Sequence, residues 1–504
     1  MKLQRVKLSG VALLVAVVAL AGFQSHTMPA NAQAAKTISY DTPVEGQISD
    51  TNIEEAWTLT APAKDLIQIT VERKDGTLAP NVELRDTNNQ RVAGADVDYT
   101  YAKATVNDFT LPAAGSYVVA VSRYTGKDGK TSGNYKLTVA LKGAGEDNPI
   151  LKAAPKSIGY DTAADGEITL GKWQESWTFN ASGKDNVSIT ADRKDGTLWP
   201  ELILQDSSGN AITRASTSRF AVASIIDHFD LPGPGAYTIV VKRYGDQAGG
   251  NFGKYSLLVS LDSAGADRPE LSNPQGPAKP DGAVTGTLTN AKWMDIWTLD
   301  AQSKDHLEIT MTTAEGNLIP EIILLGANSQ EIQRARSDDS YATAKMDATL
   351  PGPGKYAIRV QRQDGDNGFT TGKYQLSVAV LGTGDDNPMF KTSTGEVKVG
   401  TPSTGTLTNA KWQDSYTLNL TSTDPIDIIV KRTSGTLVPA IKLRGANGQD
   451  INGARADQTY ATAALSQFTP PGPGQYTIVV SRDQDAGGVT SGGYELDVNQ
   501  GKKQ

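Results

Sequence analysis

The chain repeats itself four times, and this repeat constrains its fold more than any other feature. Four landmarks return about every 120 residues, always in the same order. They are an early aromatic (Trp57, Trp177, Trp297, Tyr416), a mid-copy proline (Pro80, Pro200, Pro320, Pro439), a glycine-x-tyrosine element (ending at Tyr117, Tyr237, Tyr356, Tyr476) and a closing tyrosine (Tyr135, Tyr255, Tyr374, Tyr494). Constant register over a period of domain size predicts four tandem copies of one folded module.

Hydrophobicity within each copy alternates with a period of two residues. Ile67, Ile69 and Val71 alternate with polar neighbours, and so do the apolar residues between Tyr135 and Leu141. Such alternation buries one face of an antiparallel sheet against a second sheet. About seven or eight strands per copy are predicted, and no segment has a helical period. The expected fold class is all-β: four tandem jelly-roll-like antiparallel β-sandwich domains joined by short Gly/Pro linkers.

The predicted domain boundaries follow the repeat. Residues 37–142, 157–262, 280–382 and 398–499 form the four modules, and the segments between them are rich in glycine and proline, as linkers tend to be. The chain contains no cysteine, so each module must be held together by its own core and not by disulfides. The sequence leaves open whether the modules dock onto one another or swing freely.

The first 32 residues are predicted to be a signal peptide. Lys2, Arg5 and Lys7 form a positive start, and the apolar run from Val11 to Phe23 is too short for an ordinary membrane span. Ala30-Asn31-Ala32 supplies the small-x-small cleavage pattern. We therefore expect a secreted or extracytoplasmic protein without a membrane span. There is no cysteine for lipid attachment, and the C-terminal residues show no wall anchor.

Charge limits the partners. The chain has a formal net charge of −8, and removal of the signal with its three positive charges takes this to −11. An acidic surface disfavours nucleic acid, whose binding needs basic patches, and it disfavours anionic lipid.

The order of elements in each copy resembles the bacterial pre-peptidase C-terminal domain, here in four tandem copies. The resemblance rests on a G-x-hydrophobic start such as Gly286-Thr287-Leu288, on a strand and turn such as LILQDSSGN (202–210), and on the closing PGPGAYTIVV and KYSLLVSL segments. It also rests on an acid two residues before the early aromatic, at Glu55, Glu175, Asp295 and Asp414.

The resemblance implies a jelly-roll-like sandwich and a non-catalytic accessory module. Members of that family are associated with secreted peptidases and other surface proteins, in attachment or in folding and secretion. The family often carries an acidic turn after the mid-module strand. Asp98, Asp338 and Asp457 are assigned to that turn here, and Thr217 to the second copy, where the sequence departs from the pattern.

No catalytic residues are predicted, and we expect that the chain is not an enzyme. After removal of the signal, His228 and His306 are the remaining histidines, and they lie in different modules. A Ser-His-Asp arrangement within one site is therefore not expected, and a zinc site lacks enough ligands. The repeated acid before each aromatic is the best candidate for carboxylate chemistry, and an edge or turn carboxylate that accepts hydrogen bonds is the alternative.

Calcium is the one metal with candidate ligands, and no other cofactor is expected. Calcium takes six to eight oxygen ligands, and the turn aspartates Asp98, Asp338 and Asp457 could contribute some of them. The alternative is that these aspartates belong to solvated turns.

Four tryptophans are candidate ligand-binding residues, because a flat ring can stack on the apolar face of a sugar. Trp173, Trp293 and Trp412 recur four residues before the early aromatic, where the first copy has Ile53. Residues four apart on a strand share a face, so the alternative is that these rings extend the core. Trp199 replaces Ala79, Ile319 and Val438, so the fold does not require it; it is either an exposed contact or an apolar filler.

The sequence thus favours a secreted, non-enzymatic multi-domain binding or adhesion protein that acts at the cell surface or in the extracellular matrix, on polysaccharide or protein polymers. Tandem weak sites suit that function through avidity. The alternative is a structural spacer or surface-layer component with self-associating modules. An accessory protein to a secreted hydrolase is a third hypothesis.

Overall fold

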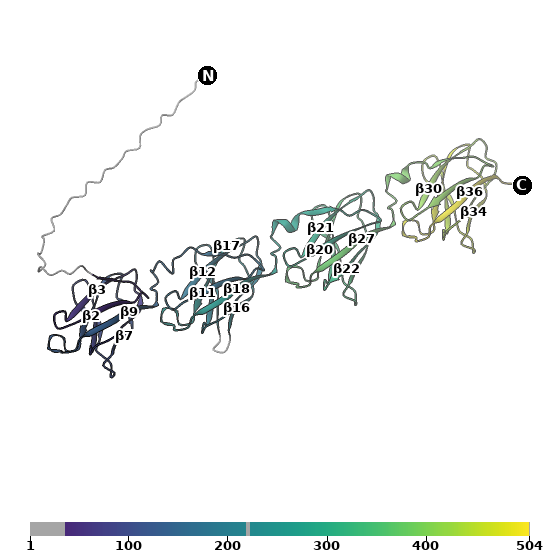
Figure 1. The fold of residues 1–504 in the computed structure, drawn as a ribbon. Helices are drawn as coiled ribbons and strands as arrows, with labels where there is room; N and C mark the ends of the chain where they lie inside the picture. The colour runs from purple at the N-terminus through teal and green to yellow at the C-terminus, as the bar shows by residue number, and fades with distance from the viewer. Residues whose placement is uncertain (1–35, 218–221, 503–504) are drawn as a thin grey trace, which may run out of the picture. The chain divides into compact units, whose positions relative to one another are not determined.

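The computed structural model describes residues 36–217 and 222–502, so the predicted signal peptide (1–32) lies outside the described residues. The described part of the chain is built from strands and short 3-10 turns in four repeated modules (Figure 1). Within these residues no helix has the length and apolar character that a membrane crossing requires. Module 1 belongs to one compact unit, which ends at Lys152, and modules 2, 3 and 4 belong to a second, which begins at Ala153.

Each module contains nine strands. Module 1 comprises β1 (Lys36–Ile38), β2 (Val44–Ile48), β3 (Glu54–Ala61), β4 (Leu66–Arg73), β5 (Pro80–Arg85), β6 (Arg91–Ala95), β7 (Lys103–Thr110), β8 (Gly115–Arg123), η1 (Gly126–Asp128) and β9 (Gly133–Gly143). Module 2 comprises β10 (Lys156–Ser157), β11 (Ala164–Ile168), β12 (Gln174–Ala181), β13 (Asn186–Arg193), β14 (Pro200–Gln205), β15 (Ala211–Ser216), β16 (Ala223–Asp230), β17 (Gly235–Arg243), η2 (Asp246–Ala248) and β18 (Gly253–Ser263).

Modules 3 and 4 repeat this order, each after a one-turn linker helix. Module 3 follows η3 (Pro269–Ser272) with β19 (Pro274–Pro277), β20 (Gly282–Leu288), β21 (Met294–Ala301), β22 (His306–Gly316), β23 (Pro320–Leu325), β24 (Glu331–Arg336), β25 (Thr343–Thr349), β26 (Gly354–Arg362), η4 (Gly365–Asn367) and β27 (Gly372–Gly382). Module 4 follows η5 (Pro388–Lys391) with β28 (Gly395–Val397), β29 (Ser403–Leu407), β30 (Gln413–Leu420), β31 (Ile426–Arg432), β32 (Pro439–Arg444), β33 (Asp450–Arg455), β34 (Thr462–Phe468), β35 (Gly474–Arg482), η6 (Asp485–Gly487) and β36 (Gly492–Gln500).

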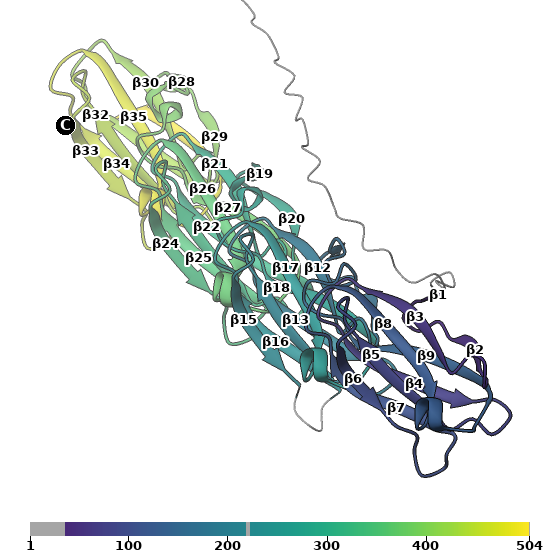
Figure 2. The ribbon, with the colours of Figure 1, turned by 90° about the vertical axis from the view of Figure 1, so that its left-hand side faces the viewer.

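Two sheets face each other in every module. In module 1 they have the orders β1-β3-β8-β5-β6 and β2-β9-β4-β7, and the other modules repeat both. Figure 2 shows β4, β7 and β9 of the second sheet lying side by side. Without β1 these are the strand orders of a jelly roll. The predicted fold class is thereby confirmed. The extra strand is the short β1, which pairs parallel to β3 at the sheet edge and was missed because three residues are too few to show a period.

A buried hydrogen-bonded chain joins the two sheets of each module and explains three of the repeated motifs. In module 2, Trp177 on β12 donates its indole N–H to the hydroxyl of Tyr255 on β18 (2.7 Å), and that hydroxyl donates to Glu175 (2.8 Å). Modules 1 and 3 repeat the chain, and in module 4 Tyr416 takes the place of the tryptophan. The repeated acid is therefore a buried partner of the closing tyrosine.

The glycine of the G-x-hydrophobic start makes room for this tyrosine. A Cβ on Gly286 would lie 2.4 Å from the hydroxyl oxygen of Tyr374. Burial alone would raise the pKa of Glu175, but hydrogen bonds from Lys156, Lys172 and Tyr255 outweigh burial and lower it. The acid is thus held as a carboxylate, which is the form that accepts the tyrosine proton.

A second tyrosine closes the turn that launches the next strand. Tyr356 on β26 donates its hydroxyl to the carbonyl oxygen of Gly352 (2.7 Å), and Gly354 between them has a φ of +155°, which favours glycine. Equivalent bonds occur in the other modules. The LPGPG segment is therefore a turn, as predicted from its prolines.

We predict that Tyr255→Phe destabilises module 2 by about 1–3 kcal/mol, because it removes the hydroxyl donor to Oε2 of the buried Glu175 and leaves the Trp177 N–H without an acceptor. The free energy of unfolding in urea, followed by tryptophan fluorescence, measures the effect. Tyr244→Phe is the matched control, since Tyr244 is 53% exposed and loses no buried bond. Equal effects of the two substitutions would contradict this account of the core.

Candidate functional site

The tryptophans that precede the early aromatics lie in the loops before β12, β21 and β30. Trp173 is 6% exposed, Trp293 5% and Trp412 2%. In this conformation none of the three rings presents a face on which a sugar could stack.

Trp293 instead binds the end of the preceding module. Its indole N–H donates to the carbonyl oxygen of Ala264, just after β18 of module 2 (2.7 Å), and the Ala264 N–H donates to the carbonyl oxygen of Asn290 (2.8 Å). Arg362, fully buried on β26, donates to the Ser263 hydroxyl (2.7 Å) and to the Asn290 side chain (3.0 Å). We call this set of contacts the joint.

The joint is repeated between modules 3 and 4. Trp412 donates to the carbonyl oxygen of Thr383. Arg482 donates to the carbonyl oxygen of Leu381 (2.9 Å) and to the Asn409 side chain (2.7 Å). Three bonds recur at both boundaries: from the tryptophan N–H to a carbonyl oxygen just after the last strand, from the N–H of that same residue to the asparagine carbonyl oxygen, and from the arginine to the asparagine side chain. The second arginine bond differs, since Arg362 reaches a serine hydroxyl and Arg482 a carbonyl oxygen. The joint is therefore a property of the repeat.

Apolar contacts close the joint. Leu271 of η3 packs with Trp293 and Met294 in a small buried cluster, and the Phe390 ring of η5 lies 4.9 Å from that of Trp412. A Cβ on Gly382 would lie 1.9 Å from the carbonyl oxygen of Ala486, so the approach of module 4 to β27 requires a glycine there.

Module 1 carries different residues at the joint positions. It has Ile53 in place of the tryptophan, and Asp50 where modules 3 and 4 have Asn290 and Asn409. Its arginine, Arg123, forms an ion pair with Asp50 (2.7 Å). The hydrogen bonds that Arg362 donates go to uncharged oxygen atoms and not to a carboxylate. Burial lowers the pKa of Arg362 to about 10.

The turn aspartates fix the hairpin that connects β6 to β7, and the same hairpin in modules 3 and 4. Oδ1 of Asp98 accepts hydrogen bonds from the backbone N–H and the hydroxyl of Thr100 (3.1 and 2.6 Å). These bonds hold the pKa of Asp98 below its usual range. Asp338 and Asp457 make the same contacts.

Calcium at these turns remains a prediction. Each of the three aspartates already accepts bonds from its own turn, and residues 36–217 and 222–502 contain no group of three or more His, Asp or Glu side chains placed to hold a metal ion. The alternative of Asx-type turns agrees with the contacts observed.

The same hairpins expose an aromatic that the sequence reasoning missed. Tyr101, Tyr341 and Tyr460 have φ of 55°, 57° and 55°, and they are 61%, 62% and 65% exposed. We call these residues the tip tyrosines; in Figure 1 the hairpin beside β7 extends away from the body of module 1. Each tip tyrosine follows its turn aspartate by three residues, so aligning the copies on those aspartates would have revealed the tyrosines.

Module 2 departs from this pattern. Leu202 pairs with Ala215 as Val82 pairs with Ala95, so Thr217 stands in the register of Val97 and not of Asp98. The assignment of Thr217 to the acidic turn was therefore wrong by one residue. The register of the tip tyrosines falls on Ala221, after Phe220, and both lie outside the described residues.

Trp199 lies on the surface of module 2, just before β14. Its ring is partly buried, and its centroid is 5.9 Å from that of Tyr244, with the two planes tilted by 57°. Trp199 lines an open depression of about 470 Å³. Of the four tryptophans predicted as ligand contacts, Trp199 is the one with ring surface available.

A serine, a histidine and an aspartate meet in module 2, but not in catalytic order. Ser188 donates its hydroxyl to Oδ2 of Asp262 (2.5 Å), and Nδ1 of His228 lies 3.2 Å from the same oxygen. A nucleophile requires the histidine between serine and acid, whereas here the acid lies between the other two. His306 is in another module and contacts Asp347 (2.6 Å).

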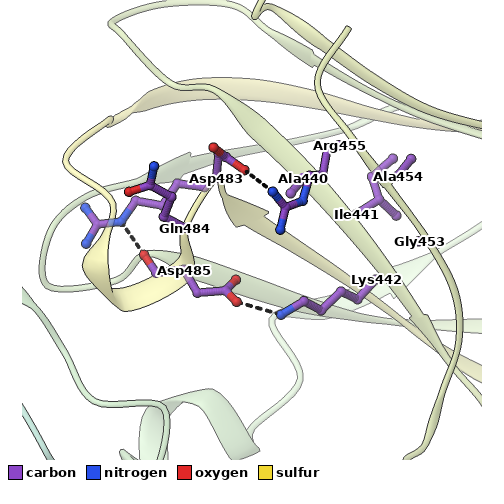
Figure 3. Close-up of a pocket in the computed structure, with 10 residues that line it drawn as sticks. Ala440, Ile441, Lys442, Gly453, Ala454, Arg455, Asp483, Gln484 and Asp485 are labelled. Carbon is purple, nitrogen blue, oxygen red and sulfur yellow. Dashed lines mark hydrogen bonds and ion pairs between the residues drawn. The ribbon is translucent and has the colours of Figure 1, made fainter.

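Figure 3 shows a pocket of about 290 Å³ in module 4. Its charged groups are paired: Lys442 with Asp485 (2.8 Å) and Arg455 with Asp483 (3.7 Å). At the equivalent place in module 2 the depression is only about 60 Å³, because Glu201 and Arg214 stand where module 4 has Ala440 and Gly453. The pocket therefore follows from smaller side chains, and its lining carboxylates are each bound to a basic side chain of the same pocket.

Comparison with known proteins finds likeness in structure only. A search of protein families matches none, and no curated protein matches the chain. Among solved structures, one module is similar to the pre-peptidase C-terminal domain of collagenase from Bacillus anthracis, at 19% identity and a TM-score of 0.18, covering 21% of this chain and 96% of that one.

Two multi-module proteins are similar over most of the chain. One is a tetra-tandem repeat in the extending region of a large adhesion protein (11% identity, TM-score 0.17, covering 92% of this chain and 98% of that one). The other is the BSP domain of a biofilm associated protein (11% identity, TM-score 0.14, covering 94% and 99%). Function is therefore inferred below from the residues of this chain alone.

We predict that Trp412→Ile loosens the joint between modules 3 and 4. Isoleucine occupies the same place in module 1, so the module itself should fold, while the lost ring costs about 2–5 kcal/mol of packing. Because the chain has no cysteine, spin labels can be placed on one introduced cysteine in each of modules 3 and 4. The distance distribution should be narrow before the substitution and broad after it. Equal widths would show that the joint does not fix these modules.

Proposed function

We propose that the chain is an exported, non-enzymatic adhesion protein that binds neutral polysaccharide through aromatic side chains at one end of modules 1, 3 and 4. The single observation that carries this proposal is the tip tyrosines: three tyrosines at the same register, exposed and held in a left-handed backbone conformation.

The backbone at these positions is costly for the residue it carries. A left-handed conformation costs a residue with a Cβ about 1–2 kcal/mol, and glycine or asparagine would relieve most of it. Burial of the tyrosine side chain offsets little of this cost, since the three residues are 61%, 62% and 65% exposed. Strain retained at an exposed aromatic in module after module supports a role in binding.

The surroundings of the tip tyrosines favour a neutral ligand. The threonine or serine hydroxyl in each turn is already bound to the turn aspartate. Asp96 and Asp98 in module 1, and Asp338 and Asp339 in module 3, place negative charge in the same hairpins as the tip tyrosines. These carboxylates would repel an anionic polymer, whereas the ring can stack on the apolar face of an uncharged sugar.

The joint supports binding to an extended polymer. It fixes module 3 to module 2 and module 4 to module 3 through buried hydrogen bonds, so Tyr341 and Tyr460 are held at a set distance. Tandem weak sites on one chain raise the overall affinity by effective concentration when their spacing fits the ligand.

A structural spacer is the second candidate, and the joint is the observation that favours it. Docked modules would hold whatever lies at either end of the chain apart even without a ligand of their own. An accessory role beside a secreted hydrolase would use the same contacts and is not distinguished by them. Catalysis by the chain itself is not supported by the Ser188, His228 and Asp262 geometry or by the paired charges of the pocket in module 4.

We predict that the triple substitution of Tyr101, Tyr341 and Tyr460 by Asn abolishes binding while keeping the fold. Asparagine tolerates the left-handed conformation, so unfolding should occur at the same denaturant concentration or higher. Retention of the mature chain on insoluble neutral polysaccharides should fall by about 100-fold or more, since avidity gains are of that order. Collagen-like protein and cell-wall fractions complete the panel.

The matched control replaces Tyr124, an exposed tyrosine of module 1 outside the hairpin, with Asn. Retention of the triple variant at the level of the unsubstituted chain would overturn the tip tyrosines as the contact. Retention on collagen-like protein alone would replace polysaccharide by a protein polymer. No retention of the unsubstituted chain on any of these polymers would leave the spacer function as the better account.

A further inference from the structure

Module 2 lacks the tip tyrosine but carries a second group of aromatics near the same place. In module 1, Nη1 of Arg73 donates to the carbonyl oxygens of both Leu78 and Tyr101 (3.1 Å each), so the residue after Leu78 lies beside the tip. In module 2, Arg193 occupies the place of Arg73 and donates to the carbonyl oxygen of Leu198 (3.2 Å), and the residue that follows is Trp199. Module 2 thus carries an aromatic, Trp199, at a position that neighbours the tip in module 1.

The fold does not need a tryptophan at this position. The backbone N–H of Ala79, Ile319 and Val438 donates to a threonine hydroxyl in the other modules. In module 2 the N–H of Trp199 donates to Oδ1 of Asn251 (3.0 Å) instead. Nδ2 of Asn251 also donates to the carbonyl oxygen of Tyr244 (2.9 Å), which fixes the loop below the two rings.

Two further aromatics of module 2 stand exposed around Trp199. Tyr244 is 53% exposed, and its ring centroid lies 5.9 Å from that of Trp199. Phe252, at a position that holds Ser132, Thr371 or Ser491 in the other modules, is 43% exposed. Large aromatics are normally buried where the fold allows it, and a gathering of exposed ones marks an interaction surface.

Polar groups converge on the same depression. It is lined by Arg193, Gly196, Thr197, Trp199, Gly250 and Asn251. Its volume of about 470 Å³ lies in the usual range of small-ligand sites, roughly 300–1,000 Å³. The Thr197 hydroxyl accepts a bond from the Phe252 N–H and can still donate its own proton. The Arg193 guanidinium has five N–H donors, and the bond to Leu198 uses one.

We infer that module 2 carries a carbohydrate-binding site in which the apolar face of a neutral pyranose ring stacks on Trp199 beside Tyr244. Arg193, Thr197 and Asn251 supply hydrogen bonds to the sugar hydroxyls. The proposed function and this site share only the class of ligand; the residues differ, so either proposal can fail without the other.

Intrinsic fluorescence of the full mature chain tests this site. Trp57, Trp173, Trp177, Trp293 and Trp412 are at most 7% exposed, and Trp297 is partly buried against the core of module 3. The part of a ligand-induced change that disappears in Trp199→Ala therefore reports Trp199. The probes are neutral oligosaccharides built from glucose, mannose, galactose and N-acetylglucosamine. We expect at least one series to quench or shift the emission in a saturable way, and the change to be absent in Trp199→Ala. If no series perturbs the emission, or if Trp199→Ala responds as the unsubstituted chain does, the site is refuted.

Substitutions taken from the sister modules keep the test independent of folding. Trp199→Ala and Trp199→Ile install the residues of modules 1 and 3, and Tyr244→Gln installs that of module 3. Each should weaken oligosaccharide binding by about 10-fold or more, which corresponds to about 1.4 kcal/mol. Tyr124→Gln in module 1, which has Ala79 beside it, is the matched control and should change nothing. Equal loss in the control would reassign the effect to the general surface.

The tip variant separates the two proposals. The triple Tyr→Asn chain should retain the full fluorescence response to the oligosaccharide, because module 2 is unchanged in it. If that response is lost together with retention on polymer, the two sites are one, and the separate site in module 2 is overturned.

Discussion

The fold depends on one hydroxyl group in each module. The closing tyrosine lies on the last strand of each module. Its hydroxyl accepts a hydrogen bond from the early aromatic and donates one to the repeated acid, and both of these residues lie on one strand of the facing sheet. With no cysteine in the chain, this buried bond is the polar tie between the sheets, and it determines other positions around it. A glycine is needed where the tyrosine ring crosses, and a lysine or tyrosine partner must keep the acid charged.

The joint extends the same logic from within a module to the boundary between modules. A tryptophan N–H and a buried arginine satisfy carbonyl oxygens at the end of the preceding module, where water would otherwise be needed. The first copy, with Ile53 and an Arg123–Asp50 ion pair, lacks this set. Residues that look like sugar-binding aromatics in the sequence are in this way used for docking, and the exposed aromatics lie elsewhere, at the tip tyrosines and around Trp199.

Much of the fold could be predicted because the four copies act as their own alignment. The alternation of apolar and polar residues predicts the sandwich, and the prolines of LPGPG predict the turn. The sequence could not show that Glu175 is buried, since its partner Tyr255 lies 80 residues away. Comparison of the copies set Trp199, which occurs once, apart from the recurring Trp293, but both stayed candidate ligand contacts. Only the bond from Trp293 to Ala264 shows which ring is docked. The tip tyrosines were overlooked because a positive φ at a tyrosine contradicts its propensity.

The most direct measurement of the central claim is oxidative footprinting of the mature chain, free and bound to neutral polysaccharide, with mass spectrometry of each aromatic. Binding through the exposed ends of the modules predicts protection of Tyr101, Tyr341 and Tyr460, with no change at Met389, which is 45% exposed in the linker between modules 3 and 4. Equal oxidation of the three tyrosines in the free and bound states would contradict the account.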